Sequence, residues 1–214
     1  MNDILLMPIL PLRGSVLFPE LAVSVIIGRA ETVEASRVAL QRDDQSIAVF
    51  AQRDYSTERI SDTSQLYRVG TRGIIESISE VEEGFRVKIV GVERIFLEGI
   101  IHKEPFLSGA VRAHGAPVDD VSGSTGVFLD PLLGLVRKLL ELVKAELPVD
   151  LGALAALDDE PLALSYAIAT MFGFGVYEDQ KILEAATISE TLRAVLKNGI
   201  RQLKDLEGYD HPLE

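Results

Sequence analysis

The sequence predicts an α+β protein in which a β-rich N-terminal part precedes a helical C-terminal part. Residues 1–113 contain short apolar runs bounded by glycine and proline, a pattern typical of strands. Residues 114–126 are dominated by Gly, Ser, Pro and Asp, a composition typical of a linker. In residues 127–214, apolar side chains recur every three or four positions, which is the period of an amphipathic helix. We therefore expect a β-rich domain over 1–113, a linker over 114–126 and a helical bundle over 127–214.

The first β-rich stretch, residues 8–29, has an irregular pattern of apolar runs and prolines. Pro8, Pro11 and Pro19 cannot donate a backbone hydrogen bond, so these positions suit strand edges or turns. Residues 21–27 are rich in β-branched side chains and suit a strand with both faces covered. We therefore expect an irregular arch that leads into a buried strand.

The remaining β-rich sequence predicts a sheet that hides its edges. Residues 30–41 have few helix breakers and predict one helix. The turn residues 82–84 and the alternating apolar residues at 85, 87 and 89 predict a hairpin. Seven strands around one helix favour a closed or nearly closed sheet. The expected strands are residues 4–10, 21–27, 47–50, 67–79, 85–92, 95–101 and 106–113.

Capping signals divide the C-terminal part into four helices. Asp130 and Pro131 have the residue types of an N-cap followed by the first helical position. Pro161 similarly begins a second helix, which the glycines at 173 and 175 stop. A short third helix is expected over residues 178–186, and the capping box at residues 187–190 begins a fourth. Pro148 follows the end of the first helix. We expect these helices to bury their apolar stripes against each other or against the β-rich part.

Composition limits the classes of function. An apolar content of 47% is typical of a globular protein, and the net charge is −12. Acidic residues outnumber basic residues in both halves, which argues against binding to a nucleic-acid backbone. No run of apolar residues has the length of a membrane span, and the N-terminus lacks the basic region of a secretory signal. We expect a cytoplasmic protein that binds neither membranes nor nucleic acid.

Three ordered motifs resemble the N-terminal LON substrate-binding domain of ATP-dependent Lon proteases. Residues 51–54 (AQRD) follow an apolar run, and residues 66–71 read LYRVGT. The arch has the pattern P-L-R-G-x-V-x-F-P followed by G-R, which places Pro11, Leu12, Arg13, Phe18, Pro19, Gly28 and Arg29. The resemblance implies a PUA-like β pseudo-barrel followed by a helical bundle. It also implies a domain that holds apolar or unfolded segments of client proteins, with a protease or ATPase as a further partner.

The sequence carries no pattern that supports catalysis. It has no Gly-Lys dipeptide, so a phosphate-binding P-loop is absent, and no G-x-S-x-G elbow. Its three histidines lack metal-ligand spacing, and cysteine is absent. We predict no catalytic residue, no metal and no cofactor. With no room for the catalytic modules of a Lon protease in 214 residues, we expect a stand-alone LON-domain protein. Two alternatives are the truncated N-terminal region of a full-length Lon protease and an RNA-binding PUA-like module.

Arginines in the β-rich part are candidate binding residues. Arg13 lies in the apolar arch, and its five donors require partners. One reading is a buried pin whose acceptors are carbonyl groups freed by the nearby prolines. The other is a contact with a bound chain. The same two readings apply to Arg29 and Arg94.

Apolar and aromatic residues supply the other candidates. Phe18 and Pro19 are either buried or form an exposed apolar tip. Tyr67 is either a core aromatic or a peptide contact. Residues 171–174 suit either a packed helix end or an adaptable apolar surface. The candidate substrate-binding residues are Arg13, Phe18, Pro19, Arg29, Tyr67, Arg94, Met171, Phe172 and Phe174.

Overall fold

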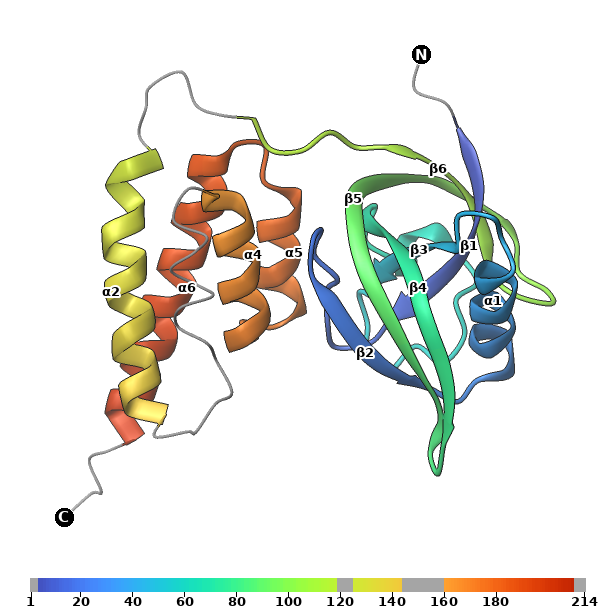
Figure 1. The fold of residues 1–214 in the computed structure, drawn as a ribbon, viewed down its shortest axis with the longest axis horizontal. Helices are drawn as coiled ribbons and strands as arrows, with labels where there is room; N and C mark the ends of the chain where they lie inside the picture. The colour runs from blue at the N-terminus through green and yellow to red at the C-terminus, as the bar shows by residue number, and fades with distance from the viewer. Residues whose placement is uncertain (1–3, 119–124, 144–159, 210–214) are drawn as a thin grey trace. The chain divides into compact units, whose positions relative to one another are not determined.

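The computed structural model confirms the α+β fold class. It describes residues 4–118, 125–143 and 160–209. The chain divides into two compact units, Met1–Ala116 and Pro117–Glu214 (Figure 1). The first unit holds all six named strands and one α-helix, and the described helices of the second unit are α-helical throughout. No described helix has the length and apolar character needed to cross a membrane.

The first unit is a closed mixed sheet with one additional strand. The strands follow the order β2-β5-β4-β3-β1-β6, and β6 also pairs with β5, which closes the ring (Figure 1). Only the β1–β3 pair is parallel among the described strand pairs. The strands are β1 Leu5–Leu12, β2 Ala22–Ile27, β3 Ser46–Ala51, β4 Val69–Val81, β5 Gly84–His102 and β6 Ser108–Ala113.

The expected strands over residues 85–92 and 95–101 form one strand, so that part of the prediction is wrong. β5 runs through 19 residues, and β4 pairs with it along one edge. On the other edge, β2 pairs with its first half and β6 with its second half. The polar pair at residues 93 and 94 suggested a break. Instead, the structure buries Arg94, whose guanidinium donates to the Gly115 carbonyl, so the strand continues.

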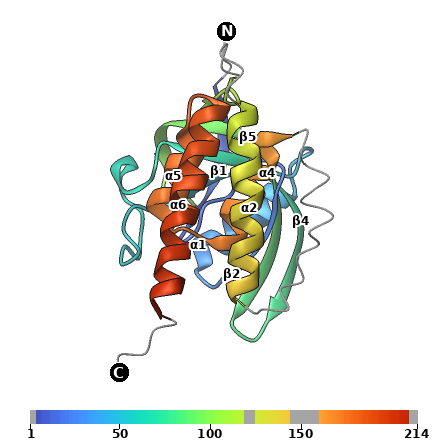
Figure 2. The ribbon, with the colours of Figure 1, turned by 90° about the vertical axis from the view of Figure 1, so that its left-hand side faces the viewer.

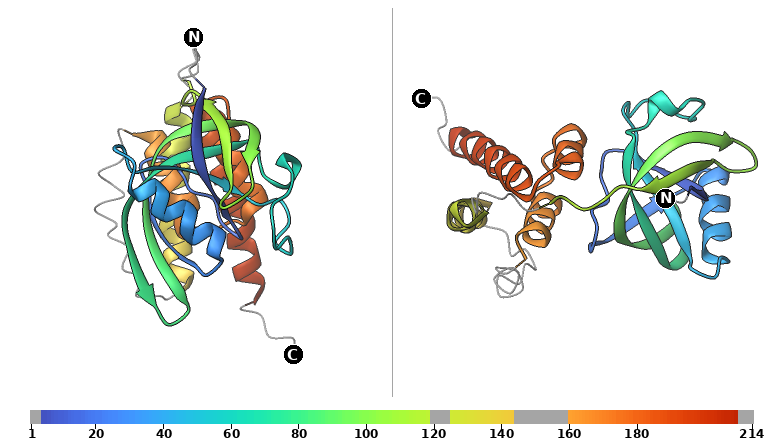
Figure 3. Two further views of the ribbon diagram at one scale, coloured as in Figure 1. Left: turned by 90° about the vertical axis from the view of Figure 1, so that its right-hand side faces the viewer. Right: turned by 90° about the horizontal axis from the view of Figure 1, so that it is seen from above.

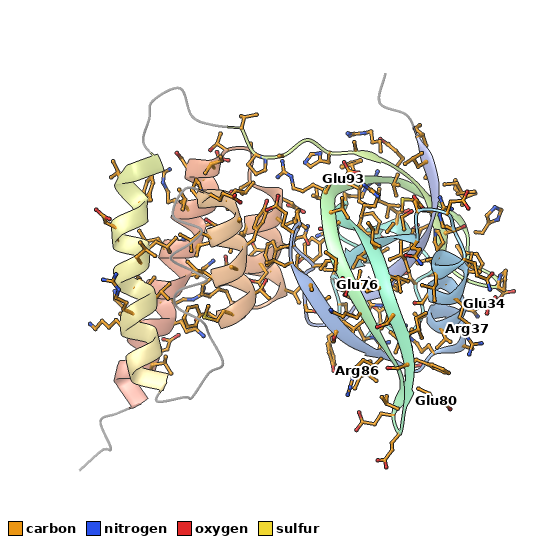
Figure 4. The ribbon with its side chains drawn as sticks, viewed as in Figure 1. Glu34, Arg37, Glu76, Glu80, Arg86 and Glu93 are labelled. Atoms are coloured by element: carbon orange, nitrogen blue, oxygen red, sulfur yellow. The ribbon has the colours of Figure 1, made fainter. Side chains whose placement is uncertain are left out.

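Helix α1, Ala30–Leu40, packs one face against the sheet (Figure 3). Its Val33 and Ala39 belong to an apolar cluster with residues of β1, β3, β4 and β5. A second cluster joins β1, β3, β5 and β6 with Ile60 and Leu66. The outer face of the β4–β5 hairpin is polar by contrast. Figure 4 labels charged side chains of this hairpin, Glu76, Glu80, Arg86 and Glu93, and two charged side chains of α1, Glu34 and Arg37.

The arch between β1 and β2 lies directly on the sheet. The hydroxyl of Thr71 donates to the Leu17 carbonyl at 2.5 Å. A Cβ on Gly91 of β5 would lie only 2.1 Å from the Phe18 carbonyl oxygen, so this position requires glycine. The structure therefore confirms an irregular arch and buries its apolar residues Val16, Leu17 and Phe18.

The second unit contains four described α-helices. Helices α2 and α6 lie side by side (Figure 2), and Leu135 of α2 packs against Gly199 of α6. Helix α4 ends at Gly173, whose φ is 56°, as the stop signal predicted. The capping box is also confirmed, because the Glu190 amide donates to the Thr187 hydroxyl at 3.1 Å. The helices are α2 Thr125–Val143, α4 Pro161–Phe172, α5 Val176–Glu184 and α6 Ile188–Tyr209.

The predicted start of the first C-terminal helix is wrong. Helix α2 begins at Thr125, and Pro131 lies inside it rather than at its first position. Phe128, N-terminal to the proline, lies under the Arg193 guanidinium of α6 at 5.6 Å from the ring centroid. We attribute the longer helix to this tertiary contact, which outweighs the local preference of proline. The predicted end before Pro148 lies outside the described residues.

Candidate functional site

Strand β2 has an edge without a pairing strand in the part of the chain that the structure describes. Among the described strands, it pairs only with β5. The Gly91 amide donates to the Leu21 carbonyl at 2.8 Å, so the backbone of Leu21 faces β5. Because bonding direction alternates along an antiparallel ladder, the amides and carbonyls of Ala22, Ser24 and Ile26 face away from the sheet. These three residues form what we call the outer edge of β2.

The side chains of β2 alternate as in a strand with one covered face. Ala22, Ser24 and Ile26 are exposed, while Val23 and Val25 pack against the apolar cluster. The prediction of a strand with both faces covered is therefore wrong. The many apolar residues of this run hid the alternation, because the Ile26 side chain is apolar yet 50% exposed.

A cavity of about 420 Å³ adjoins the outer edge. Its volume falls within the range of about 300–1,000 Å³ that is typical of ligand sites. It lies between the end of β1, the second half of β2 and the beginning of α1, and we call it the arch cavity. Its lining residues are Pro11, Leu12, Arg13, Ser15, Val25, Ile26, Ile27, Gly28, Arg29 and Thr32.

Pro11 explains why no strand pairing closes this cavity from the β1 side. The Ile9 amide donates to the Leu107 carbonyl at 2.8 Å on that edge of β1. The next residue on the same edge is Pro11, which has no amide hydrogen to donate. The pairing of β1 on this side therefore stops where the arch cavity begins.

Two of the candidate arginines line the arch cavity, and both hold the same loop. Arg13 donates from Nε to the Gln52 side-chain oxygen at 3.2 Å and from NH2 to the Thr57 carbonyl at 2.6 Å. Arg29 donates to the Glu58 carbonyl. The acceptors thus come from a distant loop rather than from carbonyls beside the prolines, and Arg13 is exposed rather than buried.

The positive charge of Arg13 affects the ionisation of Arg29. Burial, and next to it the positive charge of Arg13, lowers the pKa of the Arg29 guanidinium below its ordinary value. The carboxylates of Glu31 and Glu58 act in the opposite direction without reversing the shift. The arch cavity therefore has a locally positive wall in a chain with a net charge of −12.

The other candidates in the first unit do not line the arch cavity. Phe18 is 1% exposed and Pro19 is also buried, which excludes the exposed apolar tip. Arg94 is buried against the Gly115 carbonyl. The half-buried Tyr67 lies under the guanidinium of Arg53, which is 4.3 Å from its ring centroid.

The remaining candidates lie in the second unit. Met171, Phe172 and Phe174 are half-buried at the end of α4 and just beyond it. The Phe172 carbonyl accepts a hydrogen bond from the side-chain amide of Gln202 on α6 at 3.2 Å. Of the nine candidates, the structure therefore brings only Arg13 and Arg29 together in the arch cavity.

The sequence did not indicate the residues of the outer edge. Pro11 was recognised as a strand-edge residue, but its pairing partner depends on contacts distant in sequence. Ser24 carried a local signal, because it is a small polar residue inside a β-branched run. Among the described residues, no group of three or more acidic or histidine side chains has the arrangement of a metal site.

Comparisons with known proteins agree with this fold. Residues 7–198 match the family described as the ATP-dependent protease La (LON) substrate-binding domain. The chain is 30% identical to a Lon protease of Nitrosococcus oceani over 190 residues, which cover 87% of this chain and 24% of that protein. It is 31% identical to a Lon protease 2 of Syntrophobacter fumaroxidans over 202 residues, covering 93% of this chain and 25% of that protein. The chain thus spans about a quarter of the length of these relatives.

Two solved structures have the same fold. The N-terminal domain of a Mycobacterium avium complex Lon protease superposes with a TM-score of 0.69 at 13% identity, covering 91% of this chain and 98% of that one. A Lon N-terminal domain protein from Xanthomonas campestris gives a TM-score of 0.63 at 17% identity, with coverages of 90% and 98%. The fold, the matched residues and the sequence identity together establish that this chain belongs to the LON substrate-binding domain family.

Proposed function

We propose that this chain is a non-catalytic protein-binding domain that holds extended, apolar or unfolded segments of client proteins at the outer edge of β2. The observation that carries the proposal is the orientation of Ala22, Ser24 and Ile26. Their backbone groups face away from the only strand that pairs with β2 in the described chain. An extended segment satisfies such groups by adding a strand to the sheet.

The arch cavity gives such a segment a place for its side chains. Alternate side chains of an added strand point to opposite faces, so those on one face reach the cavity wall beside Val25 and Ile26. Ile26 presents an apolar surface there, because half of its area is exposed. Main-chain bonding supplies affinity that depends little on sequence, and the cavity adds a preference for apolar side chains.

The comparisons support a partnership with proteolysis. The relatives named Lon protease contain the matched region within chains about four times as long. We assign delivery of the held segment to an ATP-dependent protease, either in the same polypeptide or in a separate one, in the cytoplasm. RNA binding has less support, because the net charge of −12 opposes contact with phosphates.

Replacing Ser24 by proline tests the proposed edge. Ser24→Pro removes an amide hydrogen that faces away from β5, so the fold should survive while one ligand hydrogen bond is lost. We expect binding of a fluorescently labelled, permanently unfolded protein to weaken about tenfold, as measured by anisotropy. Ser24→Ala is the matched control, because it keeps the amide hydrogen, and it should bind like the native protein.

Circular dichroism must show that both variants are folded. If folded Ser24→Pro binds the unfolded client as tightly as Ser24→Ala does, the outer edge of β2 is not the site. The affinity of the native protein should also change little between low and moderate salt, since main-chain and apolar contacts release few counterions.

A further inference from the structure

The two guanidinium groups of the arch cavity lack a carboxylate partner among the described residues. Arg13 donates to an amide oxygen and a backbone carbonyl, and Arg29 donates to a backbone carbonyl. None of the described ion pairs includes either arginine. These contacts position both side chains without an ion pair. Glu31 and Glu58 compensate the charge of Arg29 only in part, because its pKa stays below the ordinary value.

Both arginines retain donors for a ligand. A guanidinium group has five N–H donors, and the described contacts of Arg13 use Nε and NH2. The described contact of Arg29 uses NH1. A carboxylate is the group that matches this geometry best, since it accepts charge-assisted and often bidentate hydrogen bonds from arginine.

The charges around the cavity favour the same kind of ligand. Arg13 and Arg29 repel each other, and burial adds to the cost of the Arg29 charge. A smaller cavity adjoins the arch cavity and shares three lining residues with it: Pro11, Arg29 and Thr32. Two further cationic residues, Arg59 and Lys103, line this smaller cavity, together with one acidic residue, Glu31. A negatively charged group placed near both arginines would relieve their repulsion.

We propose that the arch cavity selects extended client segments that carry an acidic side chain next to apolar residues, and that Arg13 and Arg29 bind its carboxylate. The inference rests on the proposed function and specifies its ligand. Ile26 lines the cavity with apolar surface, while Arg29 follows β2 after only Gly28. A strand added along β2 would therefore place an apolar side chain and an acidic one at neighbouring parts of the same cavity.

Peptides that differ at one position test this selection on the full 214-residue chain. The probe is a short peptide rich in valine and threonine, blocked at both ends, with a central glutamate. The comparison peptides carry glutamine or lysine at that position. We expect the glutamate peptide to bind about tenfold more tightly than the glutamine peptide, since charge-assisted hydrogen bonds are stronger than neutral ones. The lysine peptide should bind most weakly.

Variants of the two arginines should remove the preference without removing binding. In Arg13→Gln and in Arg29→Gln, the glutamate and glutamine peptides should approach equal affinity. Arg37→Gln is the matched control, because Arg37 is exposed on α1 (Figure 4), lies outside the cavity and carries the same charge. It should keep the tenfold preference. Arg13→Glu should reverse the selection and favour the lysine peptide. Because Arg13 is exposed, its variants should fold, so they test the inference even if Arg29→Gln does not fold.

The outcomes separate this inference from the proposed function. Equal binding of the glutamate and glutamine peptides to the native protein overturns the inference and leaves strand addition intact. Failure of every peptide and of the unfolded client to bind overturns the proposed function itself. A glutamine peptide with a free carboxyl terminus supplies the last arm. If this peptide binds more tightly than the blocked peptides through Arg13 and Arg29, while the blocked glutamate peptide does not, the site binds the carboxyl terminus of a chain. The inference of an internal acidic side chain is then wrong.

Discussion

Asp179 is the residue whose charge is least well accommodated in the described part of the second unit. It lies in α5 and is 7% exposed. One of its carboxylate oxygens has no hydrogen-bond partner among the described residues. Burial raises the pKa of Asp179 from its ordinary value of 3.8 to about 6, although amides of Phe174 and Gly175 act against this shift.

The raised pKa predicts that Asp179 destabilises the protein at neutral pH. The folded state binds the proton more tightly than the unfolded state, so the free energy of unfolding falls as pH rises from about 4 to about 6 and then stays level. Asp179→Asn should therefore be more stable than the native protein by about 1–3 kcal/mol at pH 7 and by little at pH 4. Urea unfolding at both pH values measures the difference.

Asp205→Asn on α6 provides the control, because it removes the same charge at an exposed position. If Asp179→Asn and Asp205→Asn change stability equally at pH 7, burial of the Asp179 carboxylate is not the cause.

At the scale of single residues, the sequence pointed to the two arginines that line the arch cavity but not to what they contact. Arg13 and Arg29 were singled out because charged side chains in apolar surroundings need acceptors. Those acceptors lie 44 and 29 residues away in the chain. Local pattern carries no information about such distant partners. For a related reason the sequence could not decide between the buried and the exposed reading of Phe18, since the glycine that makes room for its carbonyl is in β5.

The capping box of α6 yields a prediction at the scale of elements. The Thr187 hydroxyl accepts from the Glu190 amide at 3.1 Å, and the Glu190 carboxylate accepts from the Ala186 amide at 2.9 Å. Thr187→Ala leaves the Glu190 amide without its acceptor and should lower the free energy of unfolding by about 1 kcal/mol. Thr187→Ser keeps the hydroxyl and should cost much less. Chemical denaturation followed by helical circular dichroism distinguishes them; equal stabilities would mean that the cap contributes nothing.

Elements with strong local signals were predicted well. The alternation around residues 82–84 predicted the β4–β5 hairpin, and Pro161 and Gly173 marked both ends of α4. The failures occurred where a tertiary contact overrode a local signal. Strand β5 continues through the polar residues 93 and 94 because Arg94 is buried and hydrogen-bonded. Helix α2 continues across Pro131 because it packs on α6.

At the scale of the whole molecule, the expected boundary at residues 113 and 114 remains a prediction that fragments can test. The His114 amide donates to the Arg94 carbonyl at 2.9 Å, and the Arg94 guanidinium donates to the Gly115 carbonyl. Both apolar clusters of the first unit lie within residues 7–111, so fragments 1–113 and 1–116 each retain them.

We expect fragment 1–116 to be more stable than fragment 1–113 by about 1–3 kcal/mol, because the shorter fragment removes the Gly115 carbonyl, which accepts a hydrogen bond from the buried Arg94 guanidinium. Thermal and urea unfolding of the two fragments provide the comparison. Equal stability would place the functional end of the β-rich domain at residue 113, as the composition of the linker predicted.

The unpaired edge of β2 has a consequence for which polypeptides can become clients. A strand that joins this edge must offer an amide hydrogen at every second residue, and proline is the only residue that lacks one. Chains already folded keep those amides in their own helices and sheets. Under the proposed function, the domain therefore responds to how accessible and how straight a backbone is, more than to which amino acids it contains. Proline-rich tails of otherwise folded proteins would escape capture even when they are fully exposed and mobile.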